Sequence, residues 1–498
     1  MKHFHTLTAV ARAVVCLGAG ALLAACAVGP DYQRPSLPQA KHLAPAEVER
    51  AMLDAHQIAE ADVPAQWWQL YQSSALDRLV QAALEHNPSV PAAQAALRAA
   101  AESRRAQQAA YFPTVQASYT GARQRVADAL ASPLSSGASV FNVSTAQLSV
   151  SYTPDVFGAN RRQVESLEAQ EQSQRWNVEA TYLTLSANVV VAAIGEAGLN
   201  EQIAATRQQI ALQADLLARY RQLQAVGANS QLDVLQQEAQ LASLEASLPA
   251  LQKQLAQQRD QLKALVGVLP EDDSIATFRL DDLHLPEPLP RTLPSSLVEH
   301  RPDVLAAEAQ AQSAAAQLGV AIANRLPTIT LGVDSWGSSA ASLTHLFGAG
   351  STFWSLTGGV SQTIFDAGAL KHRSEAARAA YDEAEATYRG TVINAFQNVA
   401  DALQAVQADA TGEVAAQKAF DAAQRTFEIS RRQLELGDTS ALAVIQAEQA
   451  MQQALVARVQ ARVARLTDAA GLIQALGGGW WNRPPNEPPP QSSSSSAR

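Results

Sequence analysis

The stretch Gly227-Ala-Asn-Ser-Gln-Leu-Asp-Val-Leu-Gln-Gln-Glu-Ala-Gln-Leu241 recurs in related form as Gly437-Asp-Thr-Ser-Ala-Leu-Ala-Val-Ile-Gln-Ala-Glu-Gln-Ala-Met451. The copies lie 210 residues apart (437 − 227), and each joins two long segments rich in Gln, Arg and Ala. The Gly suits the position just after a helix, where the backbone turns left-handed. The Ser three residues later suits the N-cap of the next helix. The stretch therefore predicts two helical hairpins, and a purely structural role for both turns remains an alternative.

A second pair of segments sets the length of the repeat. Glu85-His-Asn-Pro-Ser-Val-Pro-Ala-Ala93 matches Glu299-His-Arg-Pro-Asp-Val-Leu-Ala-Ala307 at a distance of 214 residues (299 − 85). Residues 76–267 and 292–475 are therefore predicted to be two copies of one unit. The length alone suggests about three domains, but a tandem repeat favours one pseudo-symmetric body.

Each copy contains two stretches in which apolar and polar residues alternate. They lie at about 114–120 and 143–153 in the first copy, and at about 328–336 and 353–365 in the second. Alternation with period two predicts strands. The polar face holds uncharged hydroxyl and amide groups, a pattern typical of a transmembrane barrel with lipid outside and water inside. A sheet that packs its apolar face on helices is the alternative.

Four strands cannot close a barrel wide enough to hold water. If they span a membrane, several chains must combine, because a sheet edge cannot lie open in lipid. Aromatic residues near the strand ends are expected to form interfacial girdles: Phe141, Trp336, Phe353 and Phe365. The Gly-, Ser- and Ala-rich stretches at about 121–140 and 337–352 are expected to be exposed loops.

The remaining segments of each copy have helical periodicity. The run from about 159 to 225 spaces its apolar residues alternately four and three apart, and the helices after the two turns do the same. Sustained spacing of this kind predicts coiled-coil packing. At 1.5 Å per residue the first run would be roughly 100 Å long. Pro249 is expected to kink the helix that contains it.

Both ends of the chain have a composition of their own. Residues 1–25 read as a signal peptide, with Lys2 and Arg12 ahead of an apolar run from Ala13 to Ala25. Leu23-Ala-Ala-Cys26 has the form of a lipoprotein processing box, so Cys26 is predicted to carry lipid; an ordinary signal peptide with an incidental cysteine is the alternative. Residues 26–75 are expected to form an extended N-terminal segment that packs against the body, and the resemblance given below implies that this segment contributes to an equatorial region. Residues 476–498 are predicted to be a disordered tail.

Several features restrict the chemistry. An acidic, Pro-rich crossover at 268–291 separates the copies, and no apolar run of 18 residues follows Cys26, so no spanning helix is predicted. The net charge of −10 gives no reason to expect nucleic acid as a partner. Phosphate-binding loops and zinc or serine-hydrolase motifs are missing. His86 and His300 occur at helix breaks, where capping or packing is expected. Arg161-Arg162 follow a strand end and are expected to be solvated or to lie at the level of lipid headgroups. The sequence predicts no enzyme, no cofactor and no metal site.

The start of the mature chain resembles a known family. Cys26-Ala-Val-Gly-Pro-Asp-Tyr-Gln-Arg-Pro35 is similar to the start of outer membrane factor lipoproteins, the TolC-like family of NodT type. The resemblance extends to the duplicated His-x-Pro-x-Val helix starts and the Gly-x-x-Ser turns. It also covers the strand-to-helix joints Asp155-Val-Phe-Gly158 and Ile364-Phe-Asp-Ala-Gly368. It includes almost the whole mature chain apart from the tail.

The resemblance implies a mixed, mainly α fold. Four strands per protomer would contribute to a trimeric, 12-stranded β-barrel in the outer membrane, continued into the periplasm by long coiled-coil helices that form an α-barrel. The implied function is a passive exit duct of a tripartite efflux system. It would carry small molecules from a periplasmic adaptor and an inner-membrane pump to the exterior. An exit duct for type I protein secretion and a pore-less periplasmic lipoprotein are the alternatives.

The resemblance also implies roles for residues at the two turns. The adaptor would dock on the tips, at Gly227, Ser230, Leu232, Gly437, Ser440 and Leu442. A hydrophobic ring and an acidic ring would close the duct, and Leu434 and Asp438 fit these roles. The first copy has Ala228 where the second has Asp438, so an acidic ring would have three members. Alternatively, Asp438 only complements the N-terminus of the following helix.

Overall fold

The structure is a computed structural model in which residues 28–36, 47, 50, 52–53, 58–60, 62–127, 138–291 and 299–483 are described. The predicted signal peptide and Cys26 lie outside the described residues. The chain divides into two compact units. Unit 1 comprises Met1–Pro35, Leu97–Ser173 and Ala307–Tyr388; unit 2 comprises Ser36–Ala96, Gln174–Ala306 and Arg389–Arg498.

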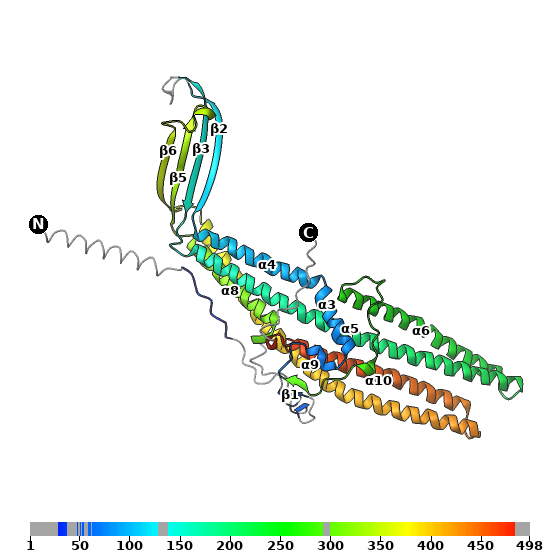
Figure 1. Ribbon diagram of the computed structural model, residues 1–498. Coiled ribbons are helices and arrows are strands. Elements are labelled where there is room, and N and C mark those ends of the chain that lie inside the picture. Colours follow the sequence, from blue (N-terminus) through cyan, green and yellow to red (C-terminus); the bar gives the residue numbers. More distant parts are fainter. Residues whose placement is uncertain are drawn as a thin grey trace. The chain divides into compact units, whose positions relative to one another are not determined.

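Unit 1 contains a four-stranded antiparallel sheet (Figure 1). Its strands, in spatial order, are β2 (Thr114–Arg125), β3 (Val140–Tyr152), β5 (Thr328–Ala340) and β6 (Thr352–Ser361). Pairing of β3 with β5 joins the two hairpins into one sheet. Among the described residues, β2 and β6 are edge strands with no further partner.

The register places apolar residues opposite one another on one face of the sheet. Val115 pairs with Val150, and Leu356 pairs with Val333. This face is open in the protomer, where Val115 is 68% exposed and Leu356 is 74% exposed. The alternative in which the apolar face packs on helices of the same chain is therefore wrong.

The aromatic residues expected to form girdles differ in their exposure in the protomer. Phe365 is 88% exposed at the base of the sheet, and Trp336 pairs directly with the exposed Trp354. Phe141 is buried instead. The second hairpin connection is also more folded than an exposed loop, because Leu346 is buried and its carbonyl accepts a hydrogen bond from the Ser338 hydroxyl.

Seven α-helices account for most of the described chain. They are α3 (Ser74–His86), α4 (Ser89–Gln108), α5 (Ala159–Ala225), α6 (Gln231–Val266), α8 (Pro302–Ala323), α9 (Ala369–Leu436) and α10 (Ala441–Ala475). Helix α6 continues through Pro249 without a break. Helix α5 includes an 18-residue stretch of mean hydropathy 1.4, long and apolar enough to cross a membrane by composition, but 56% of it is buried in the protomer. Burial in the protein accounts for this apolar character.

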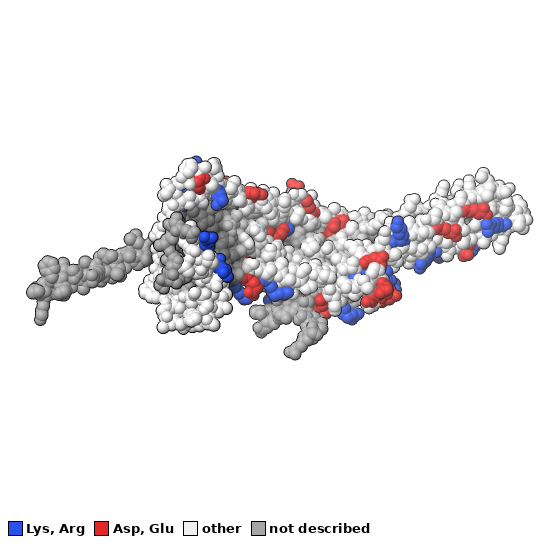
Figure 2. All heavy atoms as spheres, turned by 90° about the horizontal axis from the view of Figure 1, so that it is seen from above, with Lys and Arg blue, Asp and Glu red and all other residues white. Residues whose placement is uncertain are grey.

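Unit 2 packs the two long hairpins against each other. Near their turns, Leu217 and Tyr220 of α5, Val234 of α6 and Ile445 of α10 form one buried cluster. Acidic and basic side chains are interspersed along the helical surface seen in Figure 2. The cluster explains why the two hairpin tips lie at the same end of unit 2 (Figure 1).

Unit 2 contains a short parallel strand pair that the sequence did not predict. Strand β1 (Ile58–Glu60) pairs with β4 (Leu289–Arg291), so the N-terminal segment and the crossover lie side by side. Both strands have three residues, too few for alternation to be recognised. The tertiary contact alone defines them.

The predicted start of the disordered tail at residue 476 is wrong, because residues 476–483 are folded. The segment includes the 3₁₀ turn η5 (Trp480–Asn482), in which the side-chain amide of Asn482 donates a hydrogen bond to the Val63 carbonyl at 2.8 Å. Arg483 makes an ion pair with Glu179 at 3.1 Å. Two adjacent tryptophans supply enough apolar area to order this segment.

Close packing inside unit 2 gives the first prediction. A Cβ on Gly198 of α5 would lie 2.4 Å from Cγ2 of Val463 on α10. Because a branched valine yields little, Gly198→Ala should lower the free energy of unfolding by about 1–2 kcal/mol, despite the better helix propensity of Ala. Far-ultraviolet circular dichroism during thermal unfolding measures the change.

Gly412→Ala in α9 is the matched control, since beyond the adjoining residues and backbone of its own helix no atom lies within 4 Å of the added Cβ. It should stabilise the helix by up to about 1 kcal/mol. Equal effects of both substitutions would contradict close packing at Gly198.

Candidate functional site

Both hairpin turns close with the same hydrogen-bonded motif. The amide of Gly227 donates to the Gln224 carbonyl at 2.9 Å, and the amide of Ala228 donates to the Leu223 carbonyl at 2.8 Å. In the second turn the amides of Gly437 and Asp438 donate to Leu434 and Gln433 in the same pattern. Each Gly has a positive φ, +76° and +81°. These bonds satisfy carbonyl groups that the helix end would leave free.

The outgoing helices begin with the predicted serines. Ser230 accepts a hydrogen bond from the Asp233 amide at 3.2 Å, and the Asp233 carboxylate accepts one from the Ser230 amide at 3.0 Å. This capping box uses Asp233 to start α6. Ser440 caps α10 by accepting from the Ala443 amide at 3.3 Å.

The tips present apolar side chains to solvent. Leu232 is 64% exposed and Leu442 is 58% exposed, while Val226 and Leu436 just before the turns are 78% and 76% exposed. Exposed large apolar residues that gather at one end of a protein are typical of a surface that binds another protein. The structure thus brings the six tip residues into two neighbouring turns at one end of unit 2.

Leu434 and Asp438 lie on either side of the second turn. Leu434 is half-buried in the last turn of α9, and Asp438 is exposed. The side-chain cap of α10 comes from Ser440, and within the described residues the Asp438 carboxylate makes no hydrogen bond. Asp438 therefore does not cap α10 through a hydrogen bond, although its charge lies close before the helix begins.

An aspartate fixes each joint between the sheet and a long helix. Asp155 accepts hydrogen bonds from the amides of Asn160 at 2.9 Å and Arg161 at 2.7 Å, at the start of α5. Asp366 accepts from the amides of Gly368 and Leu370 at the start of α9. A carboxylate at a helix N-terminus satisfies free amides and complements the helix dipole.

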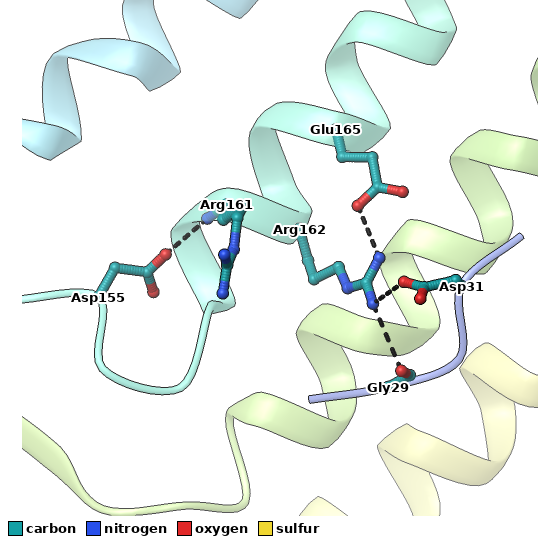
Figure 3. Close-up of polar contacts among 6 residues, drawn as sticks. All are labelled: Gly29, Asp31, Asp155, Arg161, Arg162 and Glu165. Carbon is teal, nitrogen blue, oxygen red and sulfur yellow. Dashed lines mark hydrogen bonds and ion pairs between the residues drawn. The ribbon is translucent and has the colours of Figure 1, made fainter. Parts of the chain in front are cut away.

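The N-terminal segment is clamped to unit 1 by Arg162. Figure 3 shows this side chain reaching from α5 to the segment, where it binds Asp31 at 2.6 Å and the Gly29 carbonyl at 3.4 Å. It also pairs with Glu165 at 2.8 Å. Only 6% of the Arg162 side chain is exposed, so the expectation that it is solvated is wrong.

Two glycines allow the N-terminal segment to approach helix α8 closely. A Cβ on Gly29, whose φ is +106°, would lie 2.6 Å from Cα of Gly319 on α8. Further along, Arg34 donates to Glu308 of α8 at 2.7 Å, and burial raises the pKa of the neighbouring Tyr32. The segment that follows Cys26 is thus packed on α5 and α8.

The polar face of the sheet differs from its prediction in one position. Thr145 and Ser339 exchange a hydrogen bond at 3.0 Å, and Ser335 and Ser355 do so at 3.1 Å. Asp334 interrupts this otherwise uncharged surface, and its carboxylate accepts a hydrogen bond from Thr357. The expectation of a purely uncharged face is therefore wrong.

Two carboxyl groups face each other between α9 and α10 of unit 2. Partial burial, the hydrogen bond with Asp468 and the charge of Asp468 raise the pKa of Asp409 to about 6. Arg465 lies nearby but is also paired with Glu413 and Glu287. Among the described residues, no three His, Cys, Asp or Glu side chains are grouped so that they could hold a metal ion.

The profile of the family described as outer membrane efflux protein matches residues 79–268 and 293–478 of this chain. The chain belongs to the outer membrane efflux protein family. The outer membrane protein OprJ of Pseudomonas aeruginosa is 34% identical over 388 residues, which are 77% of this chain and 78% of OprJ. The toluene efflux pump outer membrane protein TtgC of Pseudomonas putida is 29% identical, covering 92% of this chain and 93% of TtgC.

Solved structures of similar fold agree with this membership. The outer-membrane channel OprN superposes with a TM-score of 0.83 at 26% identity, over 91% of this chain and all of that one. The open-state outer membrane channel MtrE of Neisseria gonorrhoeae superposes with a TM-score of 0.79 at 24% identity, over 91% of this chain and 99% of MtrE. The second likeness shows the fold alone.

The carboxyl pair of this efflux family member predicts a dependence on pH. Because the folded pKa of Asp409 is raised, its contribution to stability is present below the ordinary carboxyl pKa and is lost as pH rises through about 6. Asp409→Asn should therefore raise the free energy of unfolding at neutral pH, by about 1 kcal/mol after allowance for solvent screening.

Thermal unfolding of wild type and variant at about pH 5 and about pH 7.5 measures this difference, which should shrink in acid. Asp421→Asn, at an exposed position of the same helix, is the control and should show little pH dependence. An Asp409→Asn effect that is equal at both pH values would contradict the raised pKa.

Proposed function

We propose that this protein is the outer membrane exit duct of a tripartite efflux system, a passive channel for small molecules. The main support for this proposal is the sheet of unit 1. Its apolar face is exposed, and within the described residues its edge strands β2 and β6 have no further strand to pair with. A membrane tolerates such strands only in a closed barrel. Three copies would supply twelve strands and close it.

The helical hairpins of unit 2 and the residues of their two turns supply the proposed periplasmic part of the duct. The long hairpins of unit 2 would form the periplasmic tube, with Gly227, Ser230, Leu232, Gly437, Ser440 and Leu442 as the surface for a periplasmic adaptor. Their exposed leucines support that role. An inner-membrane pump would supply the energy, as membership of the efflux family implies.

Lipid on Cys26 would anchor the mature chain in the outer membrane. The clamp supports this role, because the Val28 amide donates to the Phe157 carbonyl at 3.3 Å and Arg162 holds Asp31. An acyl chain two residues before Val28 would therefore be tied to unit 1. Lipid anchoring of this kind adds binding free energy in proportion to the buried methylene groups.

Conductance of the purified protein in planar bilayers tests the proposed channel. Discrete steps are expected from the detergent-purified wild type, because a closed barrel gives ions a water-filled path. Leu356→Asp places a charge on the lipid face and should abolish the steps by preventing insertion, whereas Thr357→Asn on the polar face should retain them. A wild type that inserts into the bilayer without conducting would exclude the duct.

Leu434 and Asp438 are proposed to close the periplasmic end as a hydrophobic ring and an acidic ring. Leu434→Ala combined with Asp438→Ala should remove the steric and charge barriers and make cells leaky to large antibiotics, lowering the inhibitory concentration by about fourfold or more. Growth inhibition at matched expression measures the effect.

The control replaces Gln433 and Glu435, which lie beside the proposed gate and are exposed, with Ala. This pair should leave sensitivity near that of wild type. If the double variant at 434 and 438 protects cells as well as wild type does, these residues do not form the gate.

A further inference from the structure

Asp334 is the one acidic residue in the four strands of the sheet. Strands β2, β3, β5 and β6 contain three charged residues, and the other two, Arg123 and Arg125, lie within the last three positions of β2. Asp334 instead lies midway along β5. An ionisable group inside a spanning segment is costly and is usually retained for function.

The backbone is modified at this position. Val333 pairs with Leu356 and Ser335 pairs with Ser355, so Asp334 is an extra residue that has no partner on β6. On the β3 side the register shifts at the same level, between Leu148 and Val150. A β-bulge inserts one residue and redirects the side chains that follow it. Here it lets β5 carry an additional side chain in the middle of the strand.

The bulge preserves the two faces of the sheet on both sides of Asp334. Before it, the apolar positions are Ile329, Leu331 and Val333; after it, the next apolar position is Trp336, which pairs with Trp354 on the same open face. If Asp334 were instead an ordinary residue of the strand, strict alternation would place Trp336 on the polar face. The inserted residue is therefore accommodated without moving any apolar side chain of β5 away from the lipid-facing side.

The Asp334 side chain lies on the polar face. The hydroxyl of Thr357, a residue of that face, donates a hydrogen bond to its carboxylate. Thr357 pairs with Gly332, and a Cβ on Gly332 would lie 3.6 Å from Oδ1 of Asp334. The absence of a side chain at residue 332 leaves this space open beside the carboxylate. Asp334 itself is exposed.

We propose that Asp334 sets the charge selectivity of the β-barrel lumen. This inference rests on the proposed trimeric duct, in which three symmetry-related carboxylates would form one acidic ring midway along the strands. No other charged side chain of the four strands lies at that level. A ring of carboxylates in a pore attracts cations and repels anions. The ring therefore favours cationic and protonated amine solutes over anionic ones at the exit.

Two acidic rings could give this channel a preference for cations, one at Asp438 and one at Asp334. Asp438 at the periplasmic tip would also attract cations if it forms the proposed gate, whereas Asp334 acts within the membrane-spanning strands. In an Asp438→Asn background the tip ring is neutral, so a remaining cation preference reports on the lumen. Reversal potential, rather than conductance, is the quantity that distinguishes them.

The experiment measures the reversal potential of single channels in planar bilayers under an about tenfold KCl gradient. In both the wild-type and Asp438→Asn backgrounds, Asp334→Asn should lower the ratio of K⁺ to Cl⁻ permeability by about threefold or more, with open channels still present. Asp334→Glu keeps the charge and should retain the preference. Ser335→Asn, which alters the adjacent residue of the bulge without altering charge, is the matched control.

The outcomes separate this inference from the duct itself. Wild-type channels whose reversal potential is unchanged in Asp334→Asn would overturn the inference and leave the duct in place. Complete loss of cation preference in Asp438→Asn alone would do the same, because the lumen would then contribute nothing. Wild-type protein that inserts but never conducts would overturn both. A lowered permeability ratio in Asp334→Asn, retained preference in Asp334→Glu and an unaltered ratio in Ser335→Asn would establish it.

Discussion

The unpaired edges of the four-stranded sheet are the constraint on which the account depends. Strands β2 and β6 each leave a row of backbone amides and carbonyls without a partner in the described protomer, and the apolar face between them is open. In water such a sheet would aggregate, and in lipid each free polar group would cost several kcal/mol. Closure by further copies of the same chain satisfies the backbone and places the apolar face against lipid. Most of the proposed function follows from that requirement.

Hydrogen bonds at the ends of the long helices fix where these helices begin and end relative to the strands and turns. Asp155 and Asp366 cap α5 and α9 where they leave the sheet, and the two Gly turns reverse the chain at the far ends. Arg162 fastens the N-terminal segment to the same region of α5. Each of these contacts satisfies groups that would otherwise be free at a helix end or a chain crossing. Together they define where the helices start, where they turn and where a lipid anchor would be attached.

The sequence predicted the features that depend on local chemistry. The turns at Gly227 and Gly437 follow from positive φ and serine caps, and the uninterrupted run from 159 to 225 follows from apolar spacing. Features that depend on distant partners were missed. Arg162 looks solvated beside Arg161, and only the fold shows that Asp31 approaches it. Trp480 and Trp481 look like part of a tail, because the residues to which they donate hydrogen bonds, His300 and Asp62, are more than 100 positions away in the sequence.

The bulge at Asp334 shows how a sequence signal can be present and still be overlooked. The apolar positions step from Val333 to Trp336, three residues instead of two, so strict alternation ends there. The predicted strand at 328–336 runs through this step, and alternation from Thr328 and Thr330 already places Asp334 on the polar face. The structure adds that an inserted residue returns Trp336 to the apolar face. Phe141 is a second case, since it alternates in step with Thr145 and Gln147 and pairs with Gln124, which places it on the polar face and not among the exposed apolar residues.

If three copies close the sheet into one barrel, the mass of the assembled particle must be that of three chains. Native mass spectrometry of the mature protein, released from detergent micelles, should give one species of three chains. Dilution should leave that species intact, because separating the chains would expose six strand edges. A monomer, or a mixture of sizes that changes with concentration, would contradict the closed barrel and with it the proposed duct.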